Sequence, residues 1–359
     1  MKLKTEELRK FLSAAAQIKP NPVATNLDSI KIECTGQEIV FTKTNNNIWC
    51  KYSYACQPQP IENYLVNEKL LNGIAITSKE YEVEVTAHVD GINLLVISGA
   101  DVLKIGLQDL ALFPQMPNIT STERERISKN IVERIRTASK YISNSVAISP
   151  MNFVQVGIDG IFATNGSILY YYKAFPLPDL FLSSEPLNII RARKGKEEDQ
   201  QDDDLLYSKS ESYDFFQLEG FTYGFIKSVV KPLPYAQIIQ ATGTDSFTFN
   251  RQDFVDFCTL VQYSKKQEHL NATLISTEGK KLILKYIDAD FNINVIRDIA
   301  ISASGPVQEF TFNPDWVEIL LKSLSYESLT FTRVGEGHCA VTSSEDENYK
   351  GIIARLADK

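Results

Sequence analysis

The residues with the greatest capacity for metal chemistry are five cysteines and three histidines in this 359-residue chain. His338 and Cys339 are adjacent in the segment GEGHC, which lies between two strand-like runs and reads as a turn. A zinc site usually takes about four ligands from spaced pairs, and no second pair lies near this one. We therefore expect no metal and no cofactor. The remaining thiols have no CxxC spacing and are typical of reduced core residues: Cys34, Cys50, Cys56 and Cys258.

Catalytic motifs are also missing from the sequence. It has no phosphate-binding loop, no HExxH segment, no nucleophile elbow and no pair of carboxylates that its context singles out. No apolar run approaches the roughly 18 residues that span a membrane. The first residues, MKLKTEELRKFL, reach charge before any apolar run develops, unlike a secretory signal. These features predict a non-catalytic, cytoplasmic protein that has no membrane segment.

Binding to a polyanion is the chemistry that the distribution of charge favours, although the net charge is −8. Lys and Arg outnumber Asp and Glu in five of six segments with helical apolar spacing, so the rest of the chain is strongly acidic. Basic helices can face phosphates while an acidic exterior repels nonspecific contacts. The helix dipole is the simpler explanation for cations near helix C-termini, but it does not cover Arg134 and Arg136 in mid-helix. The cations expected to face a polyanion are Lys10, Lys19, Lys69, Arg134, Arg136, Lys140, Arg191, Arg193 and Lys194.

The segments that carry these cations belong to a repeated unit of strand, cap and helix. The tetrapeptide FTFN occurs twice, ending at Asn250 and Asn313, and Asn is a good N-cap for the helical spacing that follows. Similar helix starts recur about every 60 residues, a period that indicates a structural repeat. The other starts are Thr5, Asn67, Ser128 and Ser184. Alternating strand-like runs such as SIKIEC, IWCKYSYA and KLILKYI fill the intervals. Chance spacing in an ordinary α+β protein is the alternative.

Apolar spacing predicts one buried face for each helix. Pro314 suits the first position of the last helix. The predicted faces are Leu8, Phe11, Leu12 and Ala15; Ile131, Ile135, Ala138 and Ile142; Phe254, Phe257, Cys258 and Val261; and Trp316, Ile319, Leu320 and Leu324.

Two stretches at 113–123 and 231–245 punctuate the chain and predict linkers. The expected domains are therefore 1–119, 120–240 and 241–359, each with two helices. The acidic run EEDQQDDD at 197–204 is expected to be a solvated loop.

Four stretches from end to end of the chain carry a resemblance to a known family: GADVLKIGLQDLALFPQMP, GIFATNGSILYYYKAF, PLPYAQII and IIARLADK. They resemble the bacterial DNA sliding clamps, the beta subunits of DNA polymerase III, and ATNGSIL is similar to the family segment ATDGHRL. The resemblance implies an α+β fold of three tandem clamp-type domains, each with two helices packed on antiparallel sheets. It also implies a head-to-tail homodimeric ring that encircles duplex DNA without sequence preference and acts as a processivity factor.

The resemblance further implies a hydrophobic pocket that receives short linear motifs from polymerases and clamp-loader subunits. Carried over position by position, the pocket is Ile148, Thr164, Gly166, Ser167, Leu169, Pro234, Ile238, Val341 and Ile352. The implied dimer interface sets Leu103 and Ile105, on the strand that ends domain one, against Leu260 of domain three.

This sequence departs from the family pattern at the pocket. Ser167 and Ile168 stand where the family has His and Arg, IIARL replaces the usual MPMRL ending, and three residues follow Leu356. These departures leave partner preference open. The alternative function is that of a clamp-like scaffold or specialised paralogue that binds protein partners without a processivity role.

Overall fold

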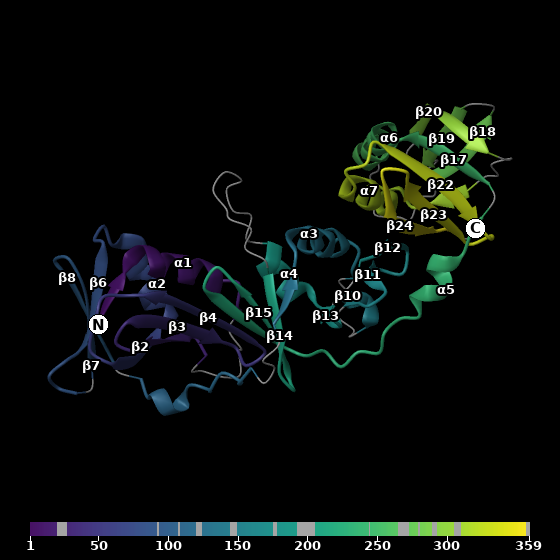
Figure 1. Cartoon of the computed structure of the whole chain (residues 1–359). Coiled ribbons are helices and arrows are strands. Elements are labelled where there is room, and N and C mark those ends of the chain that lie inside the picture. The colour runs from purple at the N-terminus through teal and green to yellow at the C-terminus, as the bar shows by residue number, and fades with distance from the viewer. Residues whose placement is uncertain are drawn as a thin grey trace. The chain divides into compact units, whose positions relative to one another are not determined.

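The structure, a computed structural model, describes residues 1–19, 27–91, 93–106, 108–119, 124–143, 149–174, 178–191, 205–243, 245–264, 273–278, 281–288, 293–304 and 310–356. Contacts divide the chain into two units, each formed by two segments. The first unit is Met1–Lys129 with Ala192–Ser228, and the second is Asn130–Arg191 with Val229–Lys359. Figure 1 shows the elements of each unit.

A helix begins within one residue of each of the six predicted starts, so this prediction is confirmed. These helices are α1 (Thr5–Ala15), α2 (Glu68–Thr77), α3 (Lys129–Ala138), α4 (Ser184–Arg191), α6 (Arg251–Ser264) and α7 (Pro314–Ser323). The side chains of Asn67, Asn250 and Asn313 accept hydrogen bonds from the backbone two residues on, at 2.9 to 3.0 Å. Thr5 and Ser184 are exceptions, because each is the first residue of its helix, and Lys4 takes the cap position of α1. The short helix α5 (Tyr235–Gln240) lies in the stretch predicted as a linker.

The predicted faces of α1 and α6 are confirmed, since all eight of the residues predicted for them are buried. The predicted face of α7 is confirmed for Leu320 and Leu324, which are buried, and wrong for Trp316 and Ile319. Ile319 is exposed and Trp316 half-buried, while Val317, Leu320 and Leu321 are fully buried. The true face is turned by one residue because Leu321 and Val317 pack inward with Leu320, a choice that apolar spacing alone left open. Ile142 lies beyond the last residue of α3 and is not on that helix.

In the first unit, α1 and α2 lie side by side over a sheet of eight described strands (Figure 1). The buried Lys43 joins the two helices, since its Nζ donates to Ala15 O at 2.9 Å and to Glu68 Oε1 at 2.6 Å. A second, four-stranded sheet has β8 at its edge. The eight strands, in spatial order, are β5 (Glu62–Asn67), β2 (Ser29–Cys34), β3 (Glu38–Thr44), β4 (Ile48–Ala55), β16 (Phe221–Ile226), β15 (Tyr213–Leu218), β14 (Leu205–Lys209) and β9 (Glu125–Ile127). The four are β1 (Lys2–Lys4), β6 (Glu82–Ala87), β7 (Asn93–Ser98) and β8 (Asp101–Gly106).

In the second unit, the described strands form one twelve-stranded antiparallel sheet. Helices α6 and α7 pack together against it, and their core includes the rings of Phe249, Phe254 and Phe331, whose centroids are 4.7 to 5.6 Å apart. The strands, in spatial order, are β13 (Leu180–Leu182), β10 (Val154–Gly157), β11 (Gly160–Thr164), β12 (Ile168–Tyr172), β24 (Asp346–Ala354), β23 (His338–Ser343), β22 (Ser328–Val334), β17 (Ser246–Asn250), β20 (Ile293–Ser304), β19 (Lys281–Asp288), β18 (Thr273–Glu278) and β21 (Phe310–Phe312).

The predicted α+β class is confirmed, and both large sheets run across the expected domain boundaries. Strand β16 pairs with β4, and β12 pairs with β24, so residues 120–240 contribute strands to both units. The two units reflect this shared pairing. The predicted division into three domains at 119 and 240 follows the repeat along the chain, whereas the two units follow contacts between strands.

Candidate functional site

An apolar row crosses the β11, β12, β24 and β23 strands of the second unit. Thr164 pairs with Leu169, Leu169 with Ile352, and Ile352 with Ala340. Directly paired residues on neighbouring strands point to the same face of a sheet. The structure therefore brings together three of the residues predicted for the peptide pocket, which are Thr164, Leu169 and Ile352.

Gly166 and Ser167 form the turn that closes this row at one end. Gly166 has a φ of +91°, which favours glycine, and its N–H donates to Thr164 Oγ1 at 3.0 Å. The Ser167 N–H donates to Asn165 Oδ1 at 2.9 Å, and its carbonyl accepts from Ala354 N at 2.8 Å. The turn is thus fastened to β24, and the N–H groups of Gly166 and Ser167 and the Ser167 carbonyl are already paired. Ile168 is buried on the opposite face from Leu169, since neighbouring strand residues alternate.

Three other predicted pocket residues lie elsewhere or outside the described chain. Val341 pairs with Gly351, and a Cβ on Gly351 would meet Leu320 of α7, so Val341 faces the helices instead of the apolar row. Ile238 is exposed on the outer side of α5. Ile148 lies outside the described residues. Ala340, Tyr235 and Phe162 belong to the apolar cluster and were missed, although strand alternation in HCAVTS points to Ala340.

The nine predicted phosphate-facing cations divide into three groups. Lys10, Lys19, Lys69 and Lys140 are exposed, and Lys10 Nζ lies 5.3 Å from the centre of the Tyr52 ring. Arg134 and Arg136 are largely covered, with 24% and 18% of their side chains exposed. The side chain of Arg191 and all of Arg193 and Lys194 lie outside the described part of the chain.

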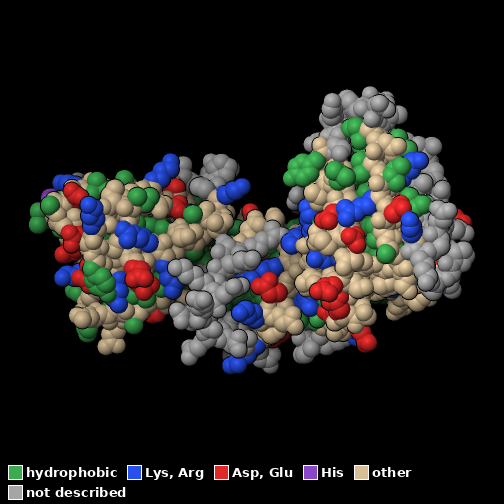
Figure 2. Space-filling model, turned by 90° about the horizontal axis from the view of Figure 1, so that it is seen from above, with side chains coloured by type: hydrophobic (Ala, Val, Ile, Leu, Met, Phe, Trp, Pro, Cys, Tyr) green, Lys and Arg blue, Asp and Glu red, His purple; other side chains and the backbone are tan. Residues whose placement is uncertain are grey.

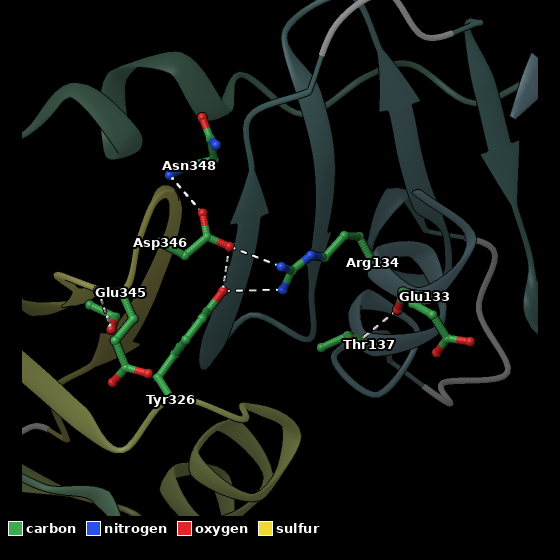
Figure 3. Close-up of polar contacts among 8 residues, drawn as sticks. Glu133, Arg134, Thr137, Tyr326, Glu345, Asp346 and Asn348 are labelled. Atoms are coloured by element: carbon green, nitrogen blue, oxygen red, sulfur yellow. Dashed lines mark hydrogen bonds and ion pairs between the residues drawn. The ribbon is translucent and has the colours of Figure 1, made fainter. Parts of the chain in front are cut away.

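Arg134 points into the second unit from α3 and joins a polar network with β24 (Figure 3). Its guanidinium donates to Asp346 Oδ2 at 2.9 Å and to the Tyr326 hydroxyl at 3.1 Å, and it lies 4.3 Å from the centre of the Tyr172 ring. The Tyr326 hydroxyl donates to the same carboxylate at 2.7 Å, and the Asn348 N–H donates to Asp346 Oδ1 at 3.1 Å. We call Arg134, Asp346 and Tyr326 the latch. It holds α3 against β24, so a guanidinium expected to meet phosphate is already paired within the protein.

A group of tyrosines surrounds the latch on the same face of the sheet. The rings of Tyr170 and Tyr349 are 5.6 Å apart, and those of Tyr326 and Tyr349 are 5.5 Å apart. Tyr141, three residues after the last residue of α3, shares a 2.6 Å hydrogen bond with Ser323 of α7. Burial raises the pKa of Tyr326, so its hydroxyl stays protonated and can donate to Asp346. The β12 and β24 strands therefore carry the apolar row on one face and the latch on the other.

Surface charge does not form a single basic patch on the face drawn in Figure 2. Lys and Arg side chains are interleaved there with Asp and Glu on both units. Arg136, for example, forms an ion pair with Glu133 one turn earlier in α3. The positive field over these helices is therefore weaker than the count of cations suggests.

His338 and Cys339 do not share a side of their strand. His338 is exposed and Cys339 is buried, and burial raises the pKa of the Cys339 thiol to about 12. A thiol of this kind is a poor metal ligand because the thiolate is the binding form. Among the described residues, no group of three or more His, Cys, Asp or Glu side chains is placed to hold a metal ion. Cys34, Cys50 and Cys258 are likewise buried, and among the described residues none of the five cysteines forms a disulfide.

The residues predicted for a dimer interface lie on the edge strand β8 and on helix α6. Strand β8 pairs only with β7 among the described strands and so presents a free edge. Leu103 is half-buried on it, and Ile105 is buried. Leu260 on α6 is 51% exposed, and the nearby Tyr263 is 87% exposed. No helix in the described chain is long and apolar enough to cross a membrane.

Comparison with known proteins identifies the fold. Neither protein-family profiles nor curated protein sequences give a match to this chain. Solved structures do. The C. crescentus beta sliding clamp has a TM-score of 0.88 at 13% identity, covering 99% of this chain and 98% of that one. The DNA polymerase III subunit beta from Pseudomonas aeruginosa has a TM-score of 0.87 at 13% identity, with 100% of both chains covered. The DNA polymerase sliding clamp from Bacillus subtilis has a TM-score of 0.87 at 14% identity, covering 100% of this chain and 99% of that one.

The chain therefore has the sliding-clamp fold over its full length. The resemblance to sliding clamps that the sequence predicts is confirmed for the fold. The identity of 13 to 14% makes this chain a divergent one, in keeping with its departures from the family pattern at the pocket residues. Identity this low establishes the fold alone.

Proposed function

We propose that this protein is a DNA sliding clamp, a non-catalytic processivity factor that encircles duplex DNA as a homodimeric ring. The observation that carries the proposal is the match to sliding clamps along the whole of both chains, with TM-scores of 0.87 to 0.88. A match of one domain would leave a ring unexplained, whereas here every unit has its counterpart. In this proposal the chain comprises three domains, 1–119, 120–240 and 241–359, and works in the cytoplasm.

The free edge of β8 supports the proposed head-to-tail assembly. An edge strand offers unpaired backbone groups to a second chain, and closed symmetric assemblies use such edges. In the proposed dimer, Leu103 and Ile105 meet the exposed Leu260 of another copy. The side chains of Leu260 and Tyr263 would then lose much of their exposure to water.

The apolar row supports the proposed tethering of polymerase and clamp-loader subunits. Leu169 and Ile352 lie side by side on one face, with Thr164 and the Ser167 turn at the end of the row. Apolar anchors of a short peptide gain most of their binding energy from such buried aliphatic positions. Because the Ser167 backbone groups are already paired, the peptide's polar contacts should be few.

A clamp-like scaffold without a processivity role remains the second candidate. The observation that favours it is the pairing of Arg134 and Arg136 within the protein, which reduces the charge available to DNA. Exposed Lys10, Lys69 and Lys140 favour the clamp instead. The two functions differ in whether the protein surrounds DNA.

The test is topological. The protein is mixed with nicked circular plasmid at a concentration high enough for it to dimerise around the DNA. It should then co-elute with the plasmid at a salt concentration that removes nonspecific binding. Cutting the plasmid once should release them, because a ring slides off a free end. A Leu103→Glu variant, which places a charge at the β8 edge, should be monomeric by light scattering and should not be retained. Wild-type protein that stays monomeric at micromolar concentration, or retention indifferent to cutting, would exclude the ring.

Charge reversal tests how the clamp meets DNA. In a Lys10→Glu, Lys69→Glu, Lys140→Glu triple variant, binding should weaken equally for all sequences, because phosphate contacts carry no base information. The slope of log affinity against log salt should fall by about 0.9 for each phosphate that the variant no longer neutralises. Fluorescence anisotropy on two unrelated duplexes measures both effects. Reversal of Lys2 and Lys51, which are exposed on strands, is the control and should change little. A sequence-selective defect would contradict the proposal.

A further inference from the structure

The apolar row proposed to take partner peptides is covered in this structure. Leu169 is 5% exposed, and Ile352 and Ala340 are 3% exposed each, which leaves no room for a partner's side chain. Open sheet faces that await a ligand expose their apolar side chains, so something within the chain must occupy this one.

The occupant is the segment 233–241, which includes helix α5. Tyr235 is buried in the same apolar cluster as Leu169, Ala340 and Ile352, and Leu233 and Ile239 pack against that cluster. The Tyr235 ring stacks on Phe162 of β11, with centroids 4.7 Å apart and planes 6° apart. Three apolar side chains from one short segment thus use the surface that a peptide motif would need.

Besides this apolar packing and the bonds within α5, hydrogen bonds hold the segment at its two ends. Pro234, the remaining residue predicted for the pocket, has φ −79° and ψ 67°. These angles form an inverse γ-turn, which is closed by a 2.9 Å bond from Tyr235 N to Leu233 O. At the other end, Lys350 Nζ donates to the carbonyls of Ile239 and, at 2.9 Å, Ala241. A helix as short as α5 is not stable by itself.

The closed position of the segment also has an unfavourable feature, a buried hydroxyl group. Among the described residues the buried Tyr235 hydroxyl has no hydrogen-bond partner. A buried donor left unpaired lowers the stability of the state that buries it. Four residues of α5 are exposed, so opening the segment would disturb little else: Ala236, Gln237, Ile238 and Gln240. These are features of a segment that opens locally before the rest of the fold.

We propose that residues 233–241 are a displaceable strap, which covers the apolar row with Tyr235 until a partner peptide with apolar anchors replaces it. The inference rests on the proposed peptide site and adds its regulation. Because only molecules with an open strap can bind, the apparent affinity is the intrinsic affinity multiplied by the fraction of molecules that are open. Residues that stabilise the closed strap therefore oppose binding, whereas residues of the row promote it.

Two substitutions at Tyr235 distinguish a strap from a pocket wall. Tyr235→Ala removes the ring that closes the strap and should tighten binding about tenfold. Tyr235→Phe keeps the ring and removes the unpaired hydroxyl, so it should stabilise closure and weaken binding by a factor of about three to ten. The probe is a fluorescein-labelled octapeptide with one Leu and one Phe in an otherwise Gly and Ser sequence, titrated by anisotropy. Gln237→Ala, exposed on the same helix, is the matched control and should leave the affinity unchanged.

The outcomes separate the strap from the peptide site itself. Binding that is abolished by Leu169→Asp but weakened by Tyr235→Ala would keep the site and overturn the strap. If the octapeptide binds no variant, the peptide site fails, and amide hydrogen exchange then decides the strap. Exchange at 235–241 that is much faster than in β12 and β24, and faster still in Tyr235→Ala, supports it. Equal protection of all three segments in the wild type would overturn it.

Discussion

An Asp346→Ala substitution should destabilise the second unit by about 2–3 kcal/mol. Asp346 accepts hydrogen bonds from Arg134, Tyr326 and Asn348, and only 12% of its side chain is exposed. Breaking a fully buried ion pair costs about 3–5 kcal/mol because one charge is left without compensation. The latch is partly solvated, with Arg134 24% exposed, so we expect a smaller loss.

Urea unfolding followed by circular dichroism measures this effect, with Glu347→Ala as the matched control. Glu347 is exposed on the same strand, one residue beyond Asp346, and its loss should change stability by less than about 0.5 kcal/mol. The double variant Arg134→Met, Asp346→Leu should recover most of the lost stability, because an apolar pair can replace an ion pair. An Asp346→Ala protein as stable as the control would show that the latch does not hold α3 to β24.

The same double variant separates the latch from DNA binding. If Arg134 acts within the protein, the double variant should retain wild-type affinity for duplex DNA, whereas Lys140→Glu should lower it. Both residues belong to the same stretch of chain, in or just after α3, so the comparison is a close one. A loss of DNA affinity in the stable double variant would restore Arg134 to the phosphate-facing set.

Leu169→Asp should lower affinity for an apolar peptide by at least a hundredfold. Leu169 lies at the centre of the row between Thr164 and Ile352, and it is buried. A carboxylate there removes the aliphatic wall and would itself be buried in apolar surroundings, which costs several kcal/mol. Truncation of a central anchor typically costs about 2 kcal/mol or more, and about 1.4 kcal/mol corresponds to one decade of affinity.

Two control variants separate an effect on peptide binding from an effect on folding. Leu169→Ala should fold and still lose about tenfold in affinity. Val341→Ala shortens a buried side chain on β23, two strands away from β12 and on the opposite face of the sheet, so it should lower stability without changing affinity. Calorimetric titration of the three variants decides between them. Equal losses for Leu169→Ala and Val341→Ala would mean that the peptide does not bind along this row.

Local sequence determined the elements of this protein. The caps Asn67, Asn250 and Asn313 mark helix starts because their side chains bond to the backbone two residues on, an interaction that needs no distant partner. The alternation in SIKIEC and IWCKYSYA sets β2 and β4 for the same reason, since the period of two belongs to the strand itself. The apolar face of α6 followed from spacing as well.

Tertiary structure decided what these elements do. The face of α7 depended on its neighbours, because apolar residues stood on more than one side of the helix and packing selected Val317 and Leu321 over Ile319. Strand pairing across the expected domain boundaries set Leu169 beside Ile352, and the placement of Tyr235 then covered them. Arg134 looked like a free cation because its partner, Asp346, is 212 residues away along the chain. A count of charges along the sequence does not predict this ion pair. Only the folded chain brings a carboxylate of low solvent exposure within 2.9 Å of the guanidinium.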